Sequence, residues 1–325
     1  MTAADVLVVS LGSTAGLRAA DEALAEALRR AGAHVAIAAA RAPRELRTYA
    51  LTDLAWARAA RVAARAGITA HAPRAIVYST TTAALLWPRP GAIRFDAPSA
   101  ANRPGRHGVW QRPLERHRLR DAPLLVPWEA RSLDEAPRPH AAAIVVPVAV
   151  SPSPSAGAPR DIAAITYAAN PQKKGLDRVL AAWAQARRAD ERLVVAGADL
   201  RLDAPGVQVA GRLAAPDYRA LLRRARVFIT APRREDYGIA QLEALADGCL
   251  LVTTAAPGPY AALPLARALD ARFVTDEAGL APALRAALDA PPADYARRAS
   301  VALAPFSRPA VDAVVREELL PRLLG

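Results

Sequence analysis

Short apolar runs rich in β-branched residues alternate with longer stretches of alanine, leucine and arginine along the whole chain. The runs lie at residues 5–10, 34–38, 75–79, 92–95, 123–127, 143–147, 161–167, 192–198, 207–211, 226–230, 250–254 and 272–275. They are apolar throughout, without strict alternation of apolar and polar positions, which is typical of parallel strands covered by helices on both faces. The sequence therefore predicts an α/β fold in which parallel strands alternate with helices.

One segment interrupts this alternation. Residues 151–160, SPSPSAGAPR, combine proline, serine and glycine without periodicity, which is typical of a linker. A chain of 325 residues is also too long for one ordinary core and suits two domains. We therefore expect two Rossmann-like doubly wound domains, at 1–150 and 161–305, facing a central cleft where a ligand would bind. A last helix, at 306–325, is expected to pack back toward the first domain.

Composition argues against several kinds of protein and site. The chain is 53% hydrophobic and 23% charged, as globular proteins are, and its single cysteine, Cys249, excludes a disulfide framework and a cysteine zinc site. The five histidines lack the spacing of metal ligands and no Asp-x-Asp motif occurs, so neither a metal nor another cofactor is expected. No leader-like start and no run of ~18 apolar residues is found, so we expect a soluble, cytoplasmic protein.

Positive charge is concentrated in the first half. The net charge is +12 and the pI is about 10.8. Residues 1–150 hold 20 basic and 12 acidic residues, and the excess is densest at 103–120, with six arginines and one glutamate. Such a run is most often a solvated helix face, and the alternative is a contact with acidic molecules. Nucleic-acid binding has little support, because no zinc module or RNP-type aromatic set accompanies the charge and aromatic residues make up only 5%.

The most informative segment is residues 234–254, REDYGIAQLEALADGCLLVTT. A strand is expected to end near Thr230, and after a short loop a helix opens near residues 237–238. The first amides of a helix have no partners within it, and together with the helix dipole they form an anion-binding site. The amides expected in this position are those of Tyr237, Gly238, Ile239 and Ala240.

Two pairs of charged residues accompany this helix start. Glu235 and Glu243 are eight residues apart, roughly 12 Å along a helix. Carboxylates would repel a phosphate, so their expected partners are hydroxyl groups. Lys173 and Lys174 are the only lysines of the chain, and they stand where a strand and a turn lead into a helix. An ammonium group at that position can reach a phosphate.

These segments together carry a resemblance. Glu235 and Glu243 form an E-x7-E pattern within EDYGIAQLEALADG, KGLDRVLAAW follows the first strand of the second domain, and VVPVAVSPSP leads into the linker. The chain resembles the retaining GT-B glycosyltransferases of family 4 over most of residues 5–255. The resemblance implies an acceptor domain followed by a donor domain. It also implies transfer of a sugar from a nucleotide diphosphate to an acceptor, with retained configuration and without a metal.

The resemblance also implies roles for individual residues. Glu235 and Lys174 would serve the reaction, with Glu235 on the sugar hydroxyls, and Glu243 would bind the ribose. The diphosphate would be bound by Lys173, Lys174 and the amides of Tyr237, Gly238, Ile239 and Ala240. The loop of the first domain that closes over the donor would contain Gly12, Ser13 and Gly16. Asp96 stands on the acceptor side, where the family often has a histidine.

Some features depart from the family. No arginine lies about six residues before Lys174, and the candidates to replace it are Lys173, Arg212 and Arg233. Residues 256–263, APGPYAAL, replace the usual glycine-pair segment. A catalytically idle nucleotide-sugar-binding protein of the same fold is therefore an alternative, ahead of a basic nucleic-acid-binding protein.

The expected partners follow from the same resemblance. They are a nucleotide-sugar donor and an unidentified acceptor, for which lipid-linked or anionic molecules are candidates, with no nucleic acid. The arginine run at 103–120 is a candidate for peripheral contact with an anionic membrane, at the inner face of the cytoplasmic membrane.

Overall fold

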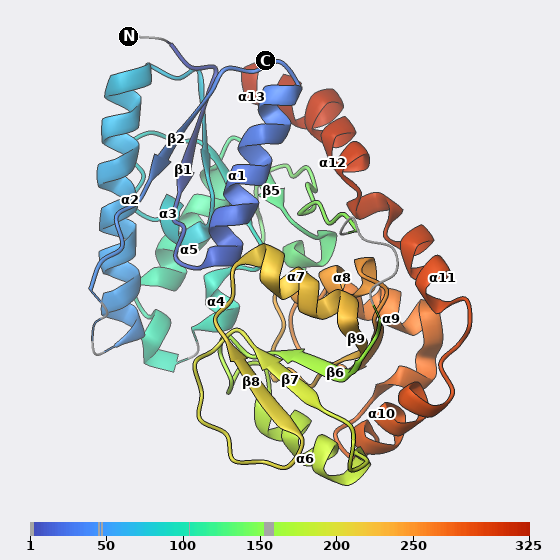
Figure 1. Ribbon diagram of the computed structural model, residues 1–325. Coiled ribbons are helices and arrows are strands. Elements are labelled where there is room, and N and C mark those ends of the chain that lie inside the picture. The colour runs from blue at the N-terminus through green and yellow to red at the C-terminus, as the bar shows by residue number, and fades with distance from the viewer. Residues whose placement is uncertain (1–2, 45, 47, 104, 153–158) are drawn as a thin grey trace. The chain divides into compact units, whose positions relative to one another are not determined.

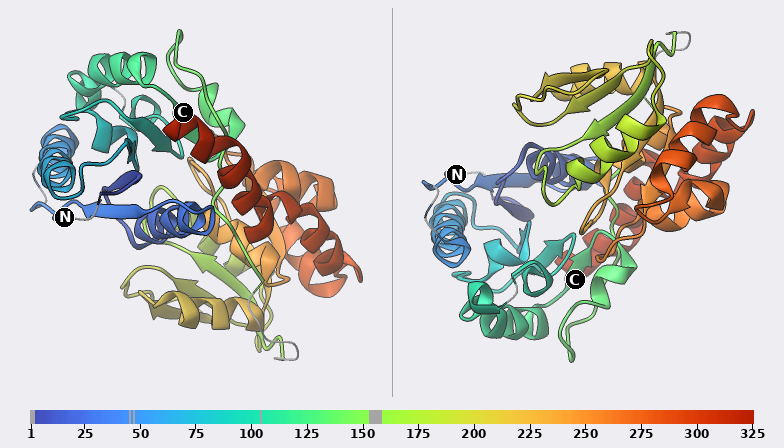
Figure 2. Two further views of the ribbon diagram at one scale, coloured as in Figure 1. Left: turned by 90° about the horizontal axis from the view of Figure 1, so that it is seen from above. Right: turned by 90° about the horizontal axis from the view of Figure 1, so that it is seen from below.

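The computed structural model describes residues 3–325 apart from 45, 47, 104 and 153–158. The described residues form two compact units, drawn in Figures 1 and 2. Unit 1 combines Met1–Ala149 with Arg308–Gly325, and unit 2 is Val150–Ser307. Most of the predicted linker, 151–160, lies outside the described residues.

The described part of unit 1 contains five parallel strands in one sheet, in the order β2-β1-β3-β4-β5. The strands are β1 (Val6–Ser10), β2 (Val35–Ala39), β3 (Ala75–Tyr78), β4 (Ala92–Phe95) and β5 (Leu125–Pro127). Each neighbouring pair is parallel, as the continuously apolar runs predict.

The prediction of a strand at residues 143–147 is wrong. This run is fully described, and in place of a strand it has an isolated bridge between Leu125 and Ala143. It lies along β5, where the amides of Ile144 and Val146 donate to the carbonyl oxygens of Leu125 and Pro127, both at 2.9 Å. Pro127 itself has no N–H to offer in return, so the regular ladder cannot continue.

Helices cover both faces of the unit 1 sheet. They are α1 (Ala15–Arg30), α2 (Tyr49–His71), α3 (Thr81–Ala84), α4 (Ser99–Asn102) and α5 (Gln111–Asp121). Val6 and Val8 of β1 share a core cluster with α1, whereas Leu7 and Val9 share the other cluster with α2 and α5. Because successive side chains of a strand point to opposite faces, an apolar β1 needs helices on both sides, as Figures 1 and 2 show.

The C-terminal residues return to unit 1. They form α12 (Arg308–Val314), a π-helical turn (Val315–Leu319) and α13 (Leu320–Leu324). Val311, Val315 and Leu319 are four residues apart and join the core cluster of α1. Arg30 of α1 forms an ion pair of 2.7 Å with Asp312. The last helical segment therefore completes the α1 side of the core.

In unit 2 the described residues form six parallel strands in one sheet, in the order β11-β10-β9-β6-β7-β8. The strands are β6 (Ile162–Tyr167), β7 (Leu193–Ala196), β8 (Val207–Gly211), β9 (Ala225–Thr230), β10 (Leu250–Thr254) and β11 (Val274–Thr275). The helices are α6 (Leu176–Ala186), α7 (Ala215–Arg224), α8 (Ile239–Ala246), α9 (Ala262–Asp270), α10 (Leu280–Asp289) and α11 (Tyr295–Ala302). The strands lie where the sequence predicts them.

Each sheet reverses its direction of growth at one point, so both are doubly wound as predicted. In unit 1 the reversal lies between β1 and β3, and in unit 2 it lies between β6 and β9. Ligands of such sheets bind outside the carboxyl ends of the strands at this switch point. The facing cleft expected from the sequence stays a prediction. No helix among the described residues has the length and apolar character needed to cross a membrane.

The packing of Leu319 gives a test of the C-terminal segment. We expect Leu319→Ala to lower the free energy of unfolding of unit 1 by about 2–5 kcal/mol, because the side chain is fully buried. Chemical denaturation monitored by circular dichroism measures this loss. Glu318→Ala, at the exposed neighbouring position, is the matched control and should have little effect. Equal stability of the two variants would contradict the packing.

Candidate functional site

Two loops meet at the switch point of unit 2. Residues 168–175 connect β6 to α6 and residues 231–238 connect β9 to α8, and both follow the carboxyl ends of adjacent strands. Gly175 has a φ of +63°, and a Cβ atom there would lie 1.9 Å from the carbonyl oxygen of Ala231. The amide of Arg233 donates to the carbonyl oxygen of Lys173 at 2.9 Å. A glycine at position 175 therefore allows the two loops to touch.

This contact brings the predicted lysines and the first glutamate together. Lys174 Nζ lies 2.8 and 2.6 Å from the two carboxylate oxygens of Glu235, and Gln241 Nε2 donates to Glu235 Oε2 at 2.8 Å. Glu235 is only 3% exposed. Lys173 forms an ion pair with Asp236, which also accepts from Arg234 Nε at 2.7 Å. The cluster also contains three residues that were not predicted, Asp236, Arg234 and Gln241, although the first two flank Glu235.

Residues 256–263, the segment that replaces the family's usual glycine-pair segment, support the loop that carries Glu235. The amide of Glu235 donates to the carbonyl oxygen of Pro257 at 3.0 Å. Gly258, with a φ of +106°, approaches so closely that a Cβ atom would lie 2.1 Å from the carbonyl oxygen of Glu235. The Tyr260 hydroxyl lies 2.6 Å from Thr253 Oγ1, which anchors this segment to β10. The loop is therefore held on both sides.

The helix predicted to bind an anion starts beside this cluster. Gly238 is the N-cap of α8, and the first bond of the helix runs from the amide of Leu242 to the carbonyl oxygen of Gly238 at 3.1 Å. Ile239 and Ala240 therefore occupy the first turn, where amides have no partner within the helix. Tyr237 precedes the cap, and its side chain is buried. The helix begins at Ile239, one or two residues later than predicted.

Glu243 belongs to a different group of charges. It lies on α8, with its side chain 24% exposed, and its Oε1 is 3.8 Å from Arg219 of α7. Arg219 donates to both carboxylate oxygens of Asp247, at 2.6 and 2.9 Å. Burial raises the pKa of Glu243 to about 7, the Arg219 guanidinium opposes this rise, and the Asp247 charge adds to it. Neither Arg219 nor Asp247 is predicted from the sequence.

The structure separates the three candidates for the missing arginine. Lys173 lies in the Glu235 cluster through Asp236. Arg233 instead binds the carboxylate of Asp177 on α6, at 2.8 and 2.6 Å, and this contact lowers the pKa of Asp177 to about 2. Arg212 is largely exposed and lies 3.5 Å from Asp199. Of the three, Lys173 is therefore the cation that the fold places in the cluster.

The predicted residues of the first domain form a separate group at the carboxyl edge of the unit 1 sheet. Gly12 and Ser13 lie in the loop after β1, and Gly16 lies in the first turn of α1. The amide of Leu11, at the start of this loop, donates to Ser79 Oγ at 2.9 Å. Because Ser79 directly follows β3, this hydrogen bond holds the loop against the end of the neighbouring strand. Asp96 follows β4, and its Oδ1 accepts a 2.8 Å hydrogen bond from the amide of Ala97.

A buried polar network that the sequence analysis missed lies beneath that loop. Ser10 Oγ donates to Asp21 Oδ2 at 2.6 Å, and Asp21 Oδ1 lies 3.9 Å from the Arg94 guanidinium. Both charged side chains are almost fully buried, and Arg94 stacks on Trp128 at 4.6 Å. Burial raises the pKa of Asp21, while Ser10 and Arg94 oppose the rise. The network connects the end of β1 to α1 and β4.

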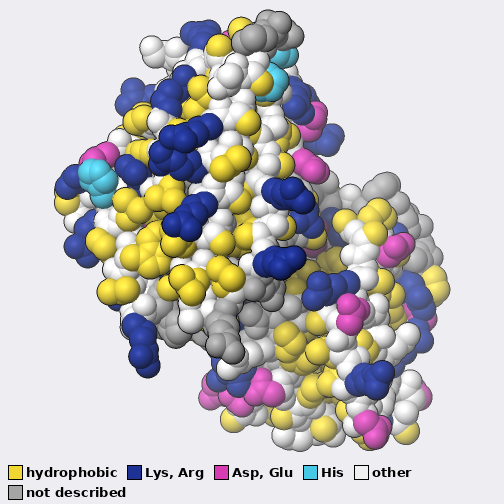
Figure 3. Space-filling view, turned by 90° about the vertical axis from the view of Figure 1, so that its left-hand side faces the viewer, with side chains coloured by type: hydrophobic (Ala, Val, Ile, Leu, Met, Phe, Trp, Pro, Cys, Tyr) yellow, Lys and Arg dark blue, Asp and Glu magenta, His cyan; other side chains and the backbone are white. Residues whose placement is uncertain are grey.

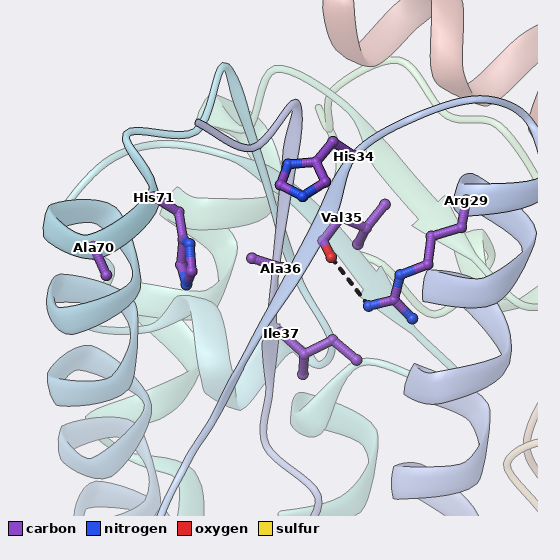
Figure 4. Close-up of a pocket in the computed structure, with 7 residues that line it drawn as sticks. All are labelled: Arg29, His34, Val35, Ala36, Ile37, Ala70 and His71. Carbon is purple, nitrogen blue, oxygen red and sulfur yellow. Dashed lines mark hydrogen bonds between the residues drawn. The ribbon is translucent and has the colours of Figure 1, made fainter. Parts of the chain in front are cut away.

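A hollow of about 450 Å³ lies at the opposite end of β2, lined by Arg29, His34, Val35, Ala36, Ile37, Ala70 and His71 (Figure 4). Arg29 donates to the carbonyl oxygen of Val35 at 3.0 Å and pairs with Glu26, and His34 Nδ1 lies 2.7 Å from the carbonyl oxygen of Ala3. These polar groups already have partners near the amino end of the strand. The hollow therefore belongs neither to the Glu235 cluster of unit 2 nor to the group of predicted residues at the carboxyl edge of the unit 1 sheet.

The described residues contain no group of three histidine, cysteine or carboxylate side chains that could hold a metal ion. The expectation that no metal takes part stays a prediction.

Two doubly wound units, one with cations and a helix start at its switch point, define a doubly wound α/β protein whose second unit is suited to bind an anion. The family model described as Glycosyl transferases group 1 matches residues 160–290, a range that includes Lys173, Lys174, Glu235 and Glu243. By sequence, no curated protein is a significant match.

Solved structures extend the likeness to the whole chain. WaaG, a glycosyltransferase involved in lipopolysaccharide biosynthesis, has a TM-score of 0.72 at 15% identity, over 98% of this chain and 99% of that one. HepE from Anabaena, solved with UDP and glucose, has a TM-score of 0.69 at 15% identity, over 97% and 98%. Sucrose-phosphate synthase from Thermosynechococcus elongatus has a TM-score of 0.66 at 14% identity, over 98% of each. The chain thus has the GT-B fold of these proteins, and its residues 160–290 match the model described as Glycosyl transferases group 1.

The environment of Glu243 predicts a pH effect on stability. An unfolded glutamate has a pKa near 4.5, whereas the pKa of folded Glu243 is about 7. Between these values the unfolded chain has released a proton that the folded protein still holds, so stability falls as pH rises and levels off above pH 7. Because the side chain is partly exposed, we expect a fall of about 1–3 kcal/mol.

Urea denaturation of the wild type and of Glu243→Gln, at several pH values across this window, isolates the contribution of this one group. The difference in stability between the two proteins should change in favour of the variant as pH rises. A difference that is independent of pH would show that Glu243 is ionised throughout.

Proposed function

We propose that the protein is a glycosyltransferase that takes a sugar from a nucleotide-diphosphate sugar bound by unit 2. The observation that carries this proposal is the Lys174–Glu235 pair beside the start of α8, at the switch point of a sheet within the matched family region. Cations, helix amides and a buried carboxylate are the groups that a diphosphate joined to a polyhydroxylated sugar requires.

The donor would exchange partners with this cluster. Lys174 and Glu235 neutralise each other in the structure described here. An arriving diphosphate would take the ammonium groups of Lys174 and Lys173 and the amides of Tyr237, Gly238, Ile239 and Ala240. Hydroxyls of the sugar would then donate to the carboxylate of Glu235, and ribose hydroxyls to Glu243. Each charged group would keep a partner throughout, which limits the cost of desolvation.

The transfer itself would retain the anomeric configuration. The bond between the anomeric carbon and the phosphate oxygen breaks, the acceptor oxygen bonds to that carbon on the same face, and its proton passes to the leaving diphosphate. The protein would contribute by orienting the two substrates and by stabilising the charge on the leaving group. Lys173, Lys174 and the start of α8 would supply that stabilisation without a metal.

The acceptor would bind at the carboxyl edge of the unit 1 sheet, near Gly12, Ser13, Gly16 and Asp96. HepE was solved with UDP and glucose, and WaaG acts in lipopolysaccharide biosynthesis, which makes a uridine donor and a lipid-linked or anionic acceptor the first choices to test. Action at the cytoplasmic face of a membrane is part of this proposal.

A thermal-shift panel of UDP, GDP, ADP and dTDP, each with its sugar derivatives, tests the donor. A ligand at 100 times its Kd adds about 2.7 kcal/mol of stability, which such a panel detects. Stabilisation followed by donor turnover supports a transferase. Binding without turnover across acceptors would instead identify an idle nucleotide-sugar-binding protein, and no response to any nucleotide would contradict the proposal.

Lys174 is expected to bind the diphosphate. Lys174→Ala should weaken nucleoside-diphosphate binding by about 10- to 150-fold, since a charge-assisted hydrogen bond contributes about 1.5–3 kcal/mol. The nucleoside without phosphates should bind almost as before, and calorimetric titration of both ligands separates the two cases. Arg233→Ala is the control, because its guanidinium faces Asp177. Equal weakening of nucleoside and nucleoside diphosphate would remove the assignment.

Glu235 should affect the sugar and not the nucleotide. Glu235→Gln should lower kcat on the order of 100-fold, because the position loses the charge that meets the sugar hydroxyls. Affinity for the free nucleoside diphosphate should stay the same or rise, since Lys174 no longer has a competing carboxylate. Steady-state kinetics and calorimetry on the same preparation measure both. A large loss of nucleoside-diphosphate affinity with unchanged kcat would contradict this role.

A further inference from the structure

Exposed hydrophobic side chains gather on one part of unit 1. Of the eight exposed large hydrophobic side chains among the described residues, six belong to unit 1. Five of these six lie on or next to α2, and their exposed fractions are 46% for Leu46, 61% for Tyr49, 50% for Leu51, 68% for Val62 and 65% for Val109. Single exposed apolar residues are ordinary, but a local group of them marks a contact surface.

Contacts within unit 1 join the segment around Val109 to the start of α2. The indole nitrogen of Trp110, next to Val109, donates to the carbonyl oxygen of Ala50 at 3.2 Å. Arg103 pairs with Asp53 of α2 at 2.7 Å and stacks over Tyr49 at 5.1 Å. The segment around Val109 is therefore bound against the start of α2.

Arginines stand between the hydrophobic side chains. Leu51, Arg58, Val62 and Arg65 are exposed and lie seven, four and three residues apart, which places them on one face of α2. We call the following group the α2 surface: Leu46, Tyr49, Leu51, Val62, Val109, Arg58, Arg65 and Arg106. Figure 3 shows hydrophobic and basic side chains intermingled over this side of unit 1.

In the part of the chain that the structure describes, few acidic residues accompany the α2 surface. Residues 41–74 contain seven arginines, of which Arg61 donates to the carbonyl oxygen of Leu86 and Arg74 lies 3.5 Å from Asp5, and two acidic residues, Glu45 and Asp53. Asp53 is buried and paired with Arg103, and Glu45 lies outside the described residues. A partner must therefore offer negative charge to the arginines and, at the same depth, an apolar layer to the leucine and valine side chains.

We propose that the α2 surface docks on the surface of an anionic phospholipid bilayer. Lipid phosphates would accept hydrogen bonds from the guanidinium groups, and the aliphatic and aromatic side chains would enter the boundary between headgroups and acyl chains. Nucleic acid fits less well, because its phosphates offer nothing to exposed leucine and valine. The helix would lie in the plane of the interface.

This surface is not the one predicted from the charge run at 103–120. Arg103 binds Asp53, and Arg112 donates to the carbonyl oxygens of Arg103 and Gly105. Arg118 donates to the carbonyl oxygen of Leu85 and stacks on Trp87 at 4.7 Å. Half of the run's arginines thus stabilise the fold of unit 1. Arg106 is the residue of that run that belongs to the α2 surface.

Vesicle co-sedimentation of the full chain tests the proposal. Vesicles of phosphatidylcholine should bind little, vesicles that also contain phosphatidylglycerol should bind more, and binding should fade as salt rises. Arg58→Gln with Arg65→Gln should weaken binding about 30-fold, taking about 1 kcal/mol for each arginine. Arg188→Gln with Arg297→Gln, at exposed positions of unit 2, is the charge-matched control and should bind like the wild type.

The apolar contribution has its own matched pair. Val62 and Val301 are both 68% exposed, the first on α2 and the second on unit 2. Val62→Ser should weaken vesicle binding severalfold, and Val301→Ser should not change it. Equal binding of neutral and anionic vesicles, or equal effects of each variant and its control, would overturn the proposal. Binding of random-sequence DNA through the same arginines without vesicle binding would also overturn it.

The proposal does not depend on the donor site. Thermal shift by the nucleoside diphosphate, measured on the same variants, should be unchanged, because no substituted residue lies in unit 2 apart from the controls. If the wild type shows no such thermal shift, the proposed transferase activity is contradicted, whereas the vesicle-binding result is unaffected.

Discussion

The parallel pairing of β6 with β9 is the constraint on which the candidate donor site depends. The chain leaves β6 toward β7 in one direction and later returns on the other side through β9, so the carboxyl ends of β6 and β9 lie next to each other. The loops after these strands must then share the same edge of the sheet. Gly175 permits their backbones to touch, and the ammonium group of Lys174 reaches Glu235, 61 residues further along the chain.

Buried charge has different consequences in the two units. In unit 1, Asp21 and Arg94 are almost fully buried, and Arg94 is held by stacking on Trp128. Such a pair gives little net stability, but removal of either partner would leave the other charge uncompensated. Its effect is therefore to fix α1 relative to β4. In unit 2 the Lys174–Glu235 pair lies beside a helix start, where an incoming anion can replace the carboxylate as partner of the lysine.

Much of this organisation can be predicted from the sequence, because it depends on local patterns. Continuous apolar runs identify parallel strands, and Gly238 before an apolar helix marks the start of that helix within one residue or two. The strand expected at 143–147 fails for a local reason too, since Pro127 cannot donate to the ladder. Arg219 and Asp247 are different, because their relation to Glu243 depends on how α7 packs against α8. No spacing in the sequence encodes that distance. The arginines at 103–120 show the same limit, because a charge run does not reveal which guanidinium groups bind backbone carbonyls.

The two glutamates of the E-x7-E pattern differ because of their surroundings and not because of their spacing. Glu235 faces an ammonium at 2.6 Å, whereas Glu243 faces a guanidinium at 3.8 Å that Asp247 already binds through two hydrogen bonds. The charge of Glu243 is therefore less compensated, and burial raises its pKa to about 7. Near that pH both forms of Glu243 are populated: the carboxylate, which only accepts hydrogen bonds, and the protonated acid, which also donates one. A pair of neighbouring hydroxyls, such as the proposed ribose diol, would donate to the carboxylate and so favour the ionised form. Binding of such a diol at Glu243, as proposed, would therefore be coupled to loss of a proton from that carboxyl group.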